Sequence, residues 1–149
     1  MFGRFTGPAR AVVTDARAIA YEQRSPTVEA EHLLLAAARR PSPLRAAGLD
    51  YETLLGALEA ERTRSLAAVG IAIDPPAAAP PVEQPRFATS AKAALERALR
   101  AAAGRRDKRI DDRHVVLGVL SARAGTVPRA LEIAGVDRAA LLAELSGPG

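Results

Sequence analysis

The segment FATSAKAALERALRAAAGRRDKRIDDRHVVLGVL, residues 87–120, repeats the pattern of FTGPARAVVTDARAIAYEQRSPTVEAEHLLLAAA, residues 5–38, at a constant offset of 82 positions, from 5 to 87. The only two histidines of the chain, His32 and His114, occupy the same place in the two copies. Repetition at matched spacing is typical of one structural unit that occurs twice. The sequence therefore predicts two versions of one module in tandem.

The composition favours helices that pack closely through small side chains. Of the 149 residues, 48% are hydrophobic but only 3% are aromatic, and most of the apolar residues are alanine and leucine. These two residues are among the strongest helix formers. A chain of this length is expected to fold around one shared core.

Capping residues and apolar spacing predict four helices in each copy. Thr6 can accept a hydrogen bond as the N-cap of the first helix, and Gly48 can end a short third helix in the left-handed conformation. The residues that can open helices along the chain are Thr6, Thr27 or a neighbour, Ser42, Asp50, Thr89 or Ser90, Asp112, Thr126 and Asp137. We expect an all-α fold of about eight helices, in two tandem four-helix repeats related by a pseudo-twofold axis.

The two repeats are predicted to form one unit over residues 1–149, with repeat one at 1–70 and repeat two at 87–146. Residues 71–86 are predicted as a proline-rich linker, because five prolines lie between positions 74 and 85. Proline removes a backbone donor and favours extended geometry. An irregular connection between the modules is therefore expected.

The net charge of +4 comes almost wholly from arginine, since Lys92 and Lys108 are the only lysines. An arginine-rich nucleic-acid-binding protein is therefore one alternative hypothesis. Against it, the arginines are spread over the chain apart from a cluster at 105–109, and few aromatic side chains are available to stack on bases. Nucleic acid is the less favoured partner.

No pattern of residues predicts catalysis, a cofactor or a metal site. The chain has no cysteine, and two histidines without clustered carboxylates do not form a metal centre. The phosphate-binding pattern Gly-x-x-x-x-Gly-Lys-Ser/Thr is missing, and no serine has a companion that would activate it. No apolar run of about 18 residues or signal-type start occurs. We expect a non-enzymatic, cytoplasmic protein without membrane contact, in which each histidine ring bonds a backbone group.

Three segments carry a resemblance to a known family: residues 2–6, residues 31–35 and the duplicate at 87–120. Together they resemble the Clp N-terminal repeat domain, which in that family precedes the ATPase rings of ClpC- and ClpA-type protein unfoldases. The resemblance covers nearly the whole chain, and its duplicated spacing makes it specific. It implies an all-α double repeat that docks substrates, degradation tags, adaptor proteins and some cyclic peptide antibiotics.

The resemblance also implies a phospho-arginine site, because family domains that read this modification match the chain at Thr6 and Glu31. A carboxylate can hold the guanidinium while a hydroxyl and free amides meet the phosphate. The alternative is that Thr6 is only an N-cap and Glu31 only a first-turn acid. The second copy has Ala88 and Arg113 at these positions, so we expect at most one such site.

A second implied surface lies where the first helices of the two repeats meet. The chain keeps residues of the family's peptide-binding and cyclic-peptide-binding surface at Phe2, Arg10, Phe87, Lys92 and Glu96. Exposed phenylalanines framed by charges suit a peptide with apolar side chains. At the position of Arg17 the family commonly has glutamine. Phe5 is expected in the core, whereas for Phe87 both core packing and binding remain open.

The resulting hypothesis is a peptide- and protein-binding module of the Clp protease system. It would act as an adaptor, or as a decoy that competes with a Clp unfoldase for degradation tags, phospho-arginine or cyclic peptide antibiotics. Its expected partners are such peptides and a Clp ATPase, its adaptors or its substrates. The chain is either a stand-alone N-domain-like protein, which its departures from the family pattern favour, or the N-terminal fragment of a full Clp ATPase.

Overall fold

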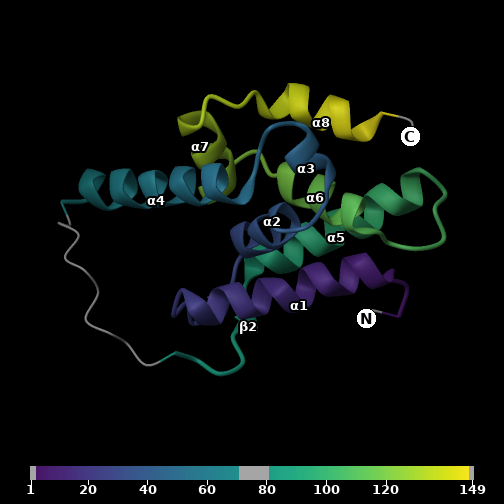
Figure 1. Cartoon of the computed structure of the whole chain (residues 1–149), viewed down its shortest axis with the longest axis horizontal. Coiled ribbons are helices and arrows are strands. Elements are labelled where there is room, and N and C mark those ends of the chain that lie inside the picture. The colour runs from purple at the N-terminus through teal and green to yellow at the C-terminus, as the bar shows by residue number, and fades with distance from the viewer. Residues whose placement is uncertain (1–2, 71–80, 148–149) are drawn as a thin grey trace.

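The structure is a computed structural model that describes residues 3–70 and 81–147 (Figure 1). The described elements are α1 (Gly7–Glu22), β1 (Thr27–Val28), α2 (Ala30–Ala38), α3 (Pro43–Ala46), α4 (Tyr51–Ala68), β2 (Arg86–Phe87), α5 (Thr89–Gly104), α6 (Asp112–Leu120), α7 (Thr126–Ile133) and α8 (Arg138–Ser146). The predicted all-α fold with four helices before the connection and four after it is confirmed. Most of the predicted linker lies outside the described residues, and the repeat boundaries stay predictions.

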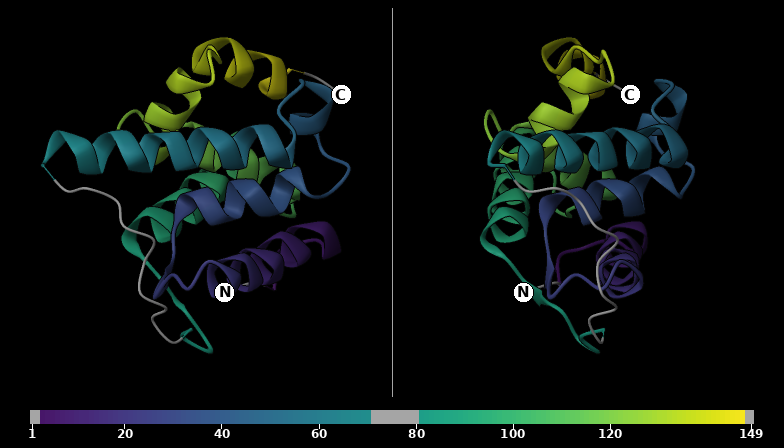
Figure 2. Two further views of the ribbon diagram at one scale, coloured as in Figure 1. Left: turned by 60° about the vertical axis from the view of Figure 1, so that its left-hand side comes forward. Right: turned by 90° about the vertical axis from the view of Figure 1, so that its left-hand side faces the viewer.

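The helices are arranged around a central pair, α2 and α6 (Figures 1 and 2). Helices α1 and α5 pack on one side of this pair, and α4, α7 and α8 lie on the other. Residues 32–38 and 114–120 are buried without a break. A helix that is apolar on all its faces is stable only when other elements surround it, which explains the central position of these two.

The extended segment in front of each repeat's first helix pairs with the other repeat. Phe87 in β2 pairs in parallel with Val28 in β1, and Phe5 forms a parallel bridge with Ile110. These two contacts are equivalent, because each phenylalanine and its partner have counterparts 82 positions away (5 to 87, 28 to 110). The exchange brings the start of α1 to the start of α6, and the start of α5 to the start of α2.

Side chains open several helices as predicted. Thr6, Asp50 and Asp137 each accept a hydrogen bond from the backbone N–H three residues on, at 3.3, 2.8 and 3.1 Å. Gly48 has a φ of +86°, as expected where a helix ends in the left-handed conformation. Phe5 is buried in the core, as predicted.

The two histidines close capping boxes at the starts of α2 and α6. The backbone N–H of Glu29 donates to Nδ1 of His32 at 2.8 Å, and the same bond from Asp111 to His114 is also 2.8 Å. Their predicted structural role is confirmed. The prediction that Asp112 caps α6 is wrong, because Asp111 is the last extended residue before the helix.

The burial of His32 makes the stability of the fold sensitive to acid. Burial lowers the pKa of His32 to about 4, with nearby Glu29 acting in the opposite direction. An unfolded histidine titrates near about 6.5, so the stabilisation is complete above that pH and is lost as the pH falls toward the folded value. We expect the free energy of unfolding to fall by roughly 2–3 kcal/mol over this interval.

Urea unfolding of the wild type and His32→Gln between pH 7 and pH 4 measures this effect, because glutamine keeps a capping-box side chain but does not titrate. The variant should lack this part of the pH dependence. Identical pH profiles in the two proteins would contradict the expectation.

Candidate functional site

Thr6 already forms hydrogen bonds with residues at the start of α6. Its hydroxyl donates to Oδ1 of Asp111 at 2.7 Å and accepts from the N–H of Ala9, while its own N–H bonds the carbonyl of Ile110 at 2.9 Å. The side chain therefore caps α1 and joins it to the second repeat.

Glu31 lies at the other inter-repeat junction, in the first turn of α2. It lines a cavity of about 340 Å³ together with Thr89 and Ser90 from the start of α5 and Arg129 from α7. The described contacts thus place Thr6 and Glu31 at different junctions. The hydroxyls that share a cavity with Glu31 belong to the opposite repeat, where sequence reasoning assigned them only to helix capping.

Ser90 fixes the α2–α5 junction. Its Oγ donates to Oε1 of Glu29 at 2.8 Å and accepts from the N–H of Ala30 at 2.8 Å. Both bonding directions of this hydroxyl are therefore used. Thr89 is exposed and lines the same cavity, so its hydroxyl remains available to a ligand.

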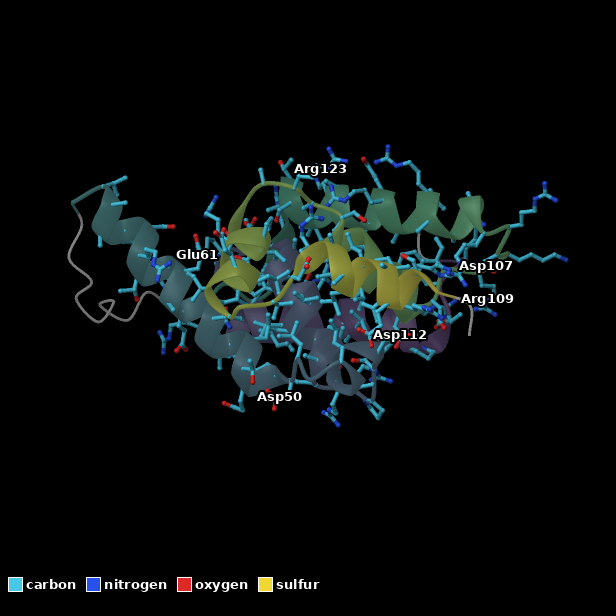
Figure 3. The ribbon with its side chains drawn as sticks, turned by 90° about the horizontal axis from the view of Figure 1, so that it is seen from above. Asp50, Glu61, Asp107, Arg109, Asp112 and Arg123 are labelled. Atoms are coloured by element: carbon cyan, nitrogen blue, oxygen red, sulfur yellow. The ribbon has the colours of Figure 1, made fainter. Side chains whose placement is uncertain are left out.

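The carboxylate of Glu31 is not neutralised by a neighbour. Burial raises the pKa of Glu31, its own backbone N–H acts in the opposite direction, and the negative charges of Glu29 and Glu61 raise the pKa further. Glu61 lies on α4 (Figure 3). Among residues 3–70 and 81–147, Glu31 forms no ion pair. An external cation would therefore find an unpaired, partly desolvated carboxylate here.

The cavity at Glu31 holds charges of both signs. Glu29 and Glu31 contribute two carboxylates, and Arg97 and Arg129 contribute two guanidinium groups, among walls that are rich in alanine. The neighbouring cavity, of about 600 Å³, also contains Glu29 and Glu31 and is floored by leucines of α2 and α4. The two cavities share Glu29, Glu31 and Thr126 in their linings.

The equivalent position in the second repeat is occupied by Arg113, whose guanidinium is used inside the protein. Its Nε donates to the carbonyl of Leu145 at 2.6 Å, and a terminal nitrogen donates to that of Gly147 at 2.6 Å. The position equivalent to Glu31 thus carries a cation that binds the end of α8. It has no carboxylate that could accept hydrogen bonds from a guanidinium. This arrangement supports the expectation of at most one phospho-arginine site, which remains a prediction.

The predicted surface between the first helices is only partly assembled. Arg10 is exposed on α1, and Lys92 and Glu96 are exposed on α5. No hydrogen bond or ion pair among the described residues joins these three side chains. Phe2 lies outside the described residues. Phe87 is half-buried and packs against the core, so its ring serves the interior as well as the surface.

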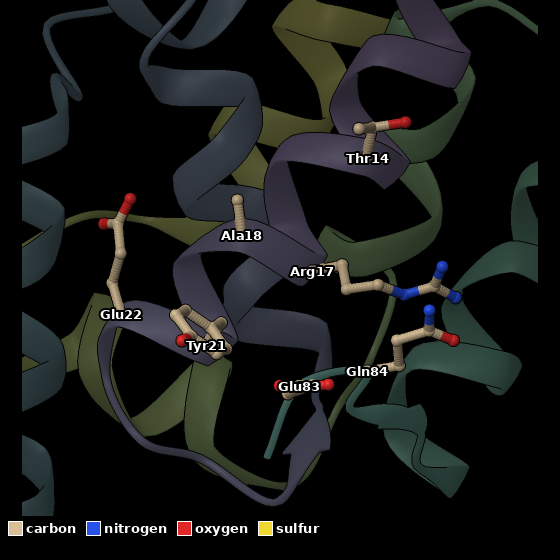
Figure 4. A pocket seen from close by; sticks show the side chains of 7 residues that line it. All are labelled: Thr14, Arg17, Ala18, Tyr21, Glu22, Glu83 and Gln84. Carbon is tan, nitrogen blue, oxygen red and sulfur yellow. The ribbon is translucent and has the colours of Figure 1, made fainter. Parts of the chain in front are cut away.

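Arg17 changes the environment of Phe87. Its guanidinium carbon lies 5.2 Å from the centroid of the Phe87 ring, within cation–π distance. A hollow of about 740 Å³ beside it is lined by α1 residues, including Arg17 and Tyr21, and by Glu83 and Gln84 (Figure 4). The arginine therefore covers part of the ring that the family resemblance assigns to peptide binding.

Comparison with known proteins shows which solved structures share this fold. No family model and no curated protein matches the chain. Solved structures do match it: the N-terminal domain of the caseinolytic protease associated chaperone ClpD from Arabidopsis thaliana has a TM-score of 0.75 and 20% identity, with 97% of this chain and 94% of that chain covered.

Two further solved structures have a similar fold. The Hsp104 N-terminal domain from Candida albicans has a TM-score of 0.68 and 19% identity, and covers 95% of this chain and 88% of its own. A structure described as part of a malarial protein secretion system has a TM-score of 0.66 and 18% identity, with 96% and 92% covered. The chain therefore has the Clp N-terminal domain fold over almost its whole length.

None of the helices in residues 3–70 and 81–147 combines the length and apolar character needed to cross a bilayer. In the same part of the chain, no three histidine, aspartate or glutamate side chains gather in a group that could hold a metal ion.

Proposed function

We propose that this chain is a non-enzymatic peptide- and protein-binding module of the Clp protease system. The fold it shares with the N-terminal domains of ClpD and Hsp104 supports this class of function. The observation that carries the proposal is the unpaired Glu31 carboxylate, which opens into a cavity of about 340 Å³ at the junction of the two repeats.

The proposed ligand is a phosphorylated arginine in a peptide. Glu31 accepts hydrogen bonds from the guanidinium part, since a charge-assisted pair of this kind is strong when partly desolvated. The free hydroxyl of Thr89 meets the phosphoryl oxygens. Thr89 takes the part that the family resemblance gives to Thr6, because the hydroxyl of Thr6 already bonds Asp111 at 2.7 Å.

A second, weaker proposal keeps Arg10, Phe87, Lys92 and Glu96 as a surface for apolar or cyclic peptides. The half-buried ring of Phe87 supports it. The guanidinium of Arg17 over this ring means that a ligand must stack on the arginine or displace it. We therefore expect weaker cyclic-peptide binding here than in a domain with glutamine at this position.

Two modes of action are consistent with such binding. A decoy needs only affinity for the same peptides that a Clp unfoldase binds, whereas an adaptor also needs a second surface that contacts the unfoldase. If the chain is the N-terminal fragment of a full Clp ATPase, the same pocket would receive substrates for the attached motor.

Pull-down with a Clp ATPase ring, combined with titration of peptides that carry phospho-arginine, tests the proposal. Affinity for the phosphorylated peptide together with capture of the ring indicates an adaptor, and affinity for the peptide alone indicates a decoy. Absence of both would end the proposal. DNA binding that weakens steeply as salt increases would favour the nucleic-acid alternative.

A further inference from the structure

An ion pair between a buried carboxylate and an exposed guanidinium connects the two repeats beside the Glu31 cavity. Glu61 on α4 is only 4% exposed, and its Oε1 accepts hydrogen bonds from Nε of Arg129 at 2.9 Å and from Oγ of Ser65 at 2.6 Å. Figure 3 shows the place of Glu61 on α4 next to α7. A buried carboxylate is costly unless it is paired, so this contact holds the Arg129 side chain in one orientation.

Only one edge of the Arg129 guanidinium is used by this pair. Nε donates to Glu61, while within the described residues the two terminal nitrogens form no hydrogen bond. The side chain remains 55% exposed and lines the same cavity as Glu31. A guanidinium has five N–H donors, so four remain in the fork geometry that matches two oxygens of a phosphoryl or carboxylate group.

We infer that Arg129, oriented by Glu61, is a second anion-binding residue of the Glu31 pocket, beside the hydroxyl of Thr89. This inference rests on the proposed function, which it deepens. Glu31 and Arg129 line the same cavity from different helices, α2 and α7, so the pocket is suited to a ligand that carries a cation and an anion close together. A phosphorylated arginine has both groups on one side chain, and an arginine at a peptide's C-terminus has them on one residue.

The arrangement also predicts weaker binding of an unmodified internal arginine. Its guanidinium would pair with Glu31 but would bring a positive charge close to Arg129 and Arg97, the latter held by the carbonyl of Gly118 at 2.7 Å. A phosphoryl group removes this conflict and adds hydrogen bonds to Arg129. Arg129 therefore sets specificity, and Glu61 is a positioning residue that acts through it.

Fluorescence anisotropy with one labelled peptide in three forms tests this inference. The arginine is internal and unmodified, internal and phosphorylated, or placed at a free C-terminus. Each form is titrated with the wild type, Arg129→Gln, Arg129→Lys and Glu61→Gln. Arg64→Gln is the matched control, because Arg64 is exposed on α4 and lines a cavity with Glu61 and Arg129 that does not include Glu31. Circular dichroism checks the helical fold of each variant.

Loss of one charge-assisted contact should cost about ten- to a hundredfold in affinity. The Arg129→Gln variant should bind the phosphorylated peptide more weakly by this factor. Its affinity for the unmodified peptide should be unchanged or higher. Arg129→Lys should recover only part of the lost affinity, Glu61→Gln should show a smaller loss, and Arg64→Gln should show none. Preference for the C-terminal form over the phosphorylated form would assign the anion site to a carboxylate.

An unchanged preference for the phosphorylated peptide in a folded Arg129→Gln variant would overturn the inference and leave the proposed function intact. Failure of the wild type to bind any of the three peptides would overturn both.

Discussion

Among the described glycines, Gly118 is the position where replacement by alanine should destabilise the protein most. A Cβ atom at this position of α6 would lie 2.2 Å from the carbonyl oxygen of Ala94 and 2.8 Å from the backbone nitrogen of Ala98. Both atoms belong to the backbone of α5, so no side-chain rotation relieves the clash. The two helices would have to separate along their closest contact.

We expect a loss of about 3 kcal/mol or more from this overpacking, which for a chain of this size lowers Tm by roughly 10 °C. Thermal unfolding followed by circular dichroism measures it. Gly56→Ala is the matched control, because Gly56 lies in α4 with open space around it. Gly56→Ala should raise the free energy of unfolding by up to about 1 kcal/mol. A Gly118→Ala protein that melts with the wild type would show that α5 and α6 are not packed this closely.

Replacement of Glu31 by glutamine should weaken phospho-arginine binding by about a hundredfold and leave the fold intact. The variant keeps the shape of the side chain but loses the charge that pairs with the guanidinium. A charge-assisted pair contributes enough for its loss to weaken binding by about a hundredfold. Isothermal titration with the phosphorylated peptide measures the loss, and Glu59→Gln, an exposed acid of the neighbouring cavity, is the control.

The same substitution should not destabilise the protein at neutral pH. Because the folded pKa of Glu31 is raised, chiefly by burial, the charged carboxylate opposes folding once the pH exceeds its unfolded value of 4.5. Glu31→Gln should therefore unfold at the same or a higher temperature than the wild type at pH 7. A large fall in Tm together with lost binding would indicate that Glu31 is only a structural first-turn acid.

Much of the fold follows from local signals in the sequence. The duplicated segment predicts two modules, and Thr6, Asp50 and Asp137 cap the helices that their positions indicate. Capping depends on residues three positions apart, so local sequence can predict it. It does not do so at every helix, because Ala88 and Gly125 precede α5 and α7 and neither start has a side-chain cap. The missed cap of α6 is an error of one residue, since Asp111 and Asp112 have the same side chain.

The candidate site could be predicted only in part, because it is built across the two repeats. Alignment of the copies relates Thr6 to Ala88, but the chain brings the start of α5 to α2 and the start of α1 to α6. Thr89 and Arg129 therefore join Glu31 from more than 50 positions away in sequence (31 to 89, 31 to 129). The repeat of 82 positions (5 to 87) relates equivalent residues of the two copies, but it does not indicate which residues of one copy contact the other.

Arg17 and Arg113 show a second reason why the site could not be predicted fully from the sequence. Sequence comparison identifies them as departures from the family pattern, but their effects depend on what each guanidinium reaches. Arg17 lies over the Phe87 ring, and Arg113 bonds two carbonyls at the end of α8. In both cases a long side chain occupies a place that the family resemblance assigns to a ligand.

The seam between the repeats at Glu31 is proposed to receive a modified peptide side chain. NMR titration of the ¹⁵N-labelled chain with a phospho-arginine peptide tests this proposal most directly. We predict amide shifts concentrated in residues 29–32, 89–90 and 125–129, with α1 unaffected. Shifts confined to α1 and the exposed face of α5, or no shifts at saturating peptide, would contradict the proposal.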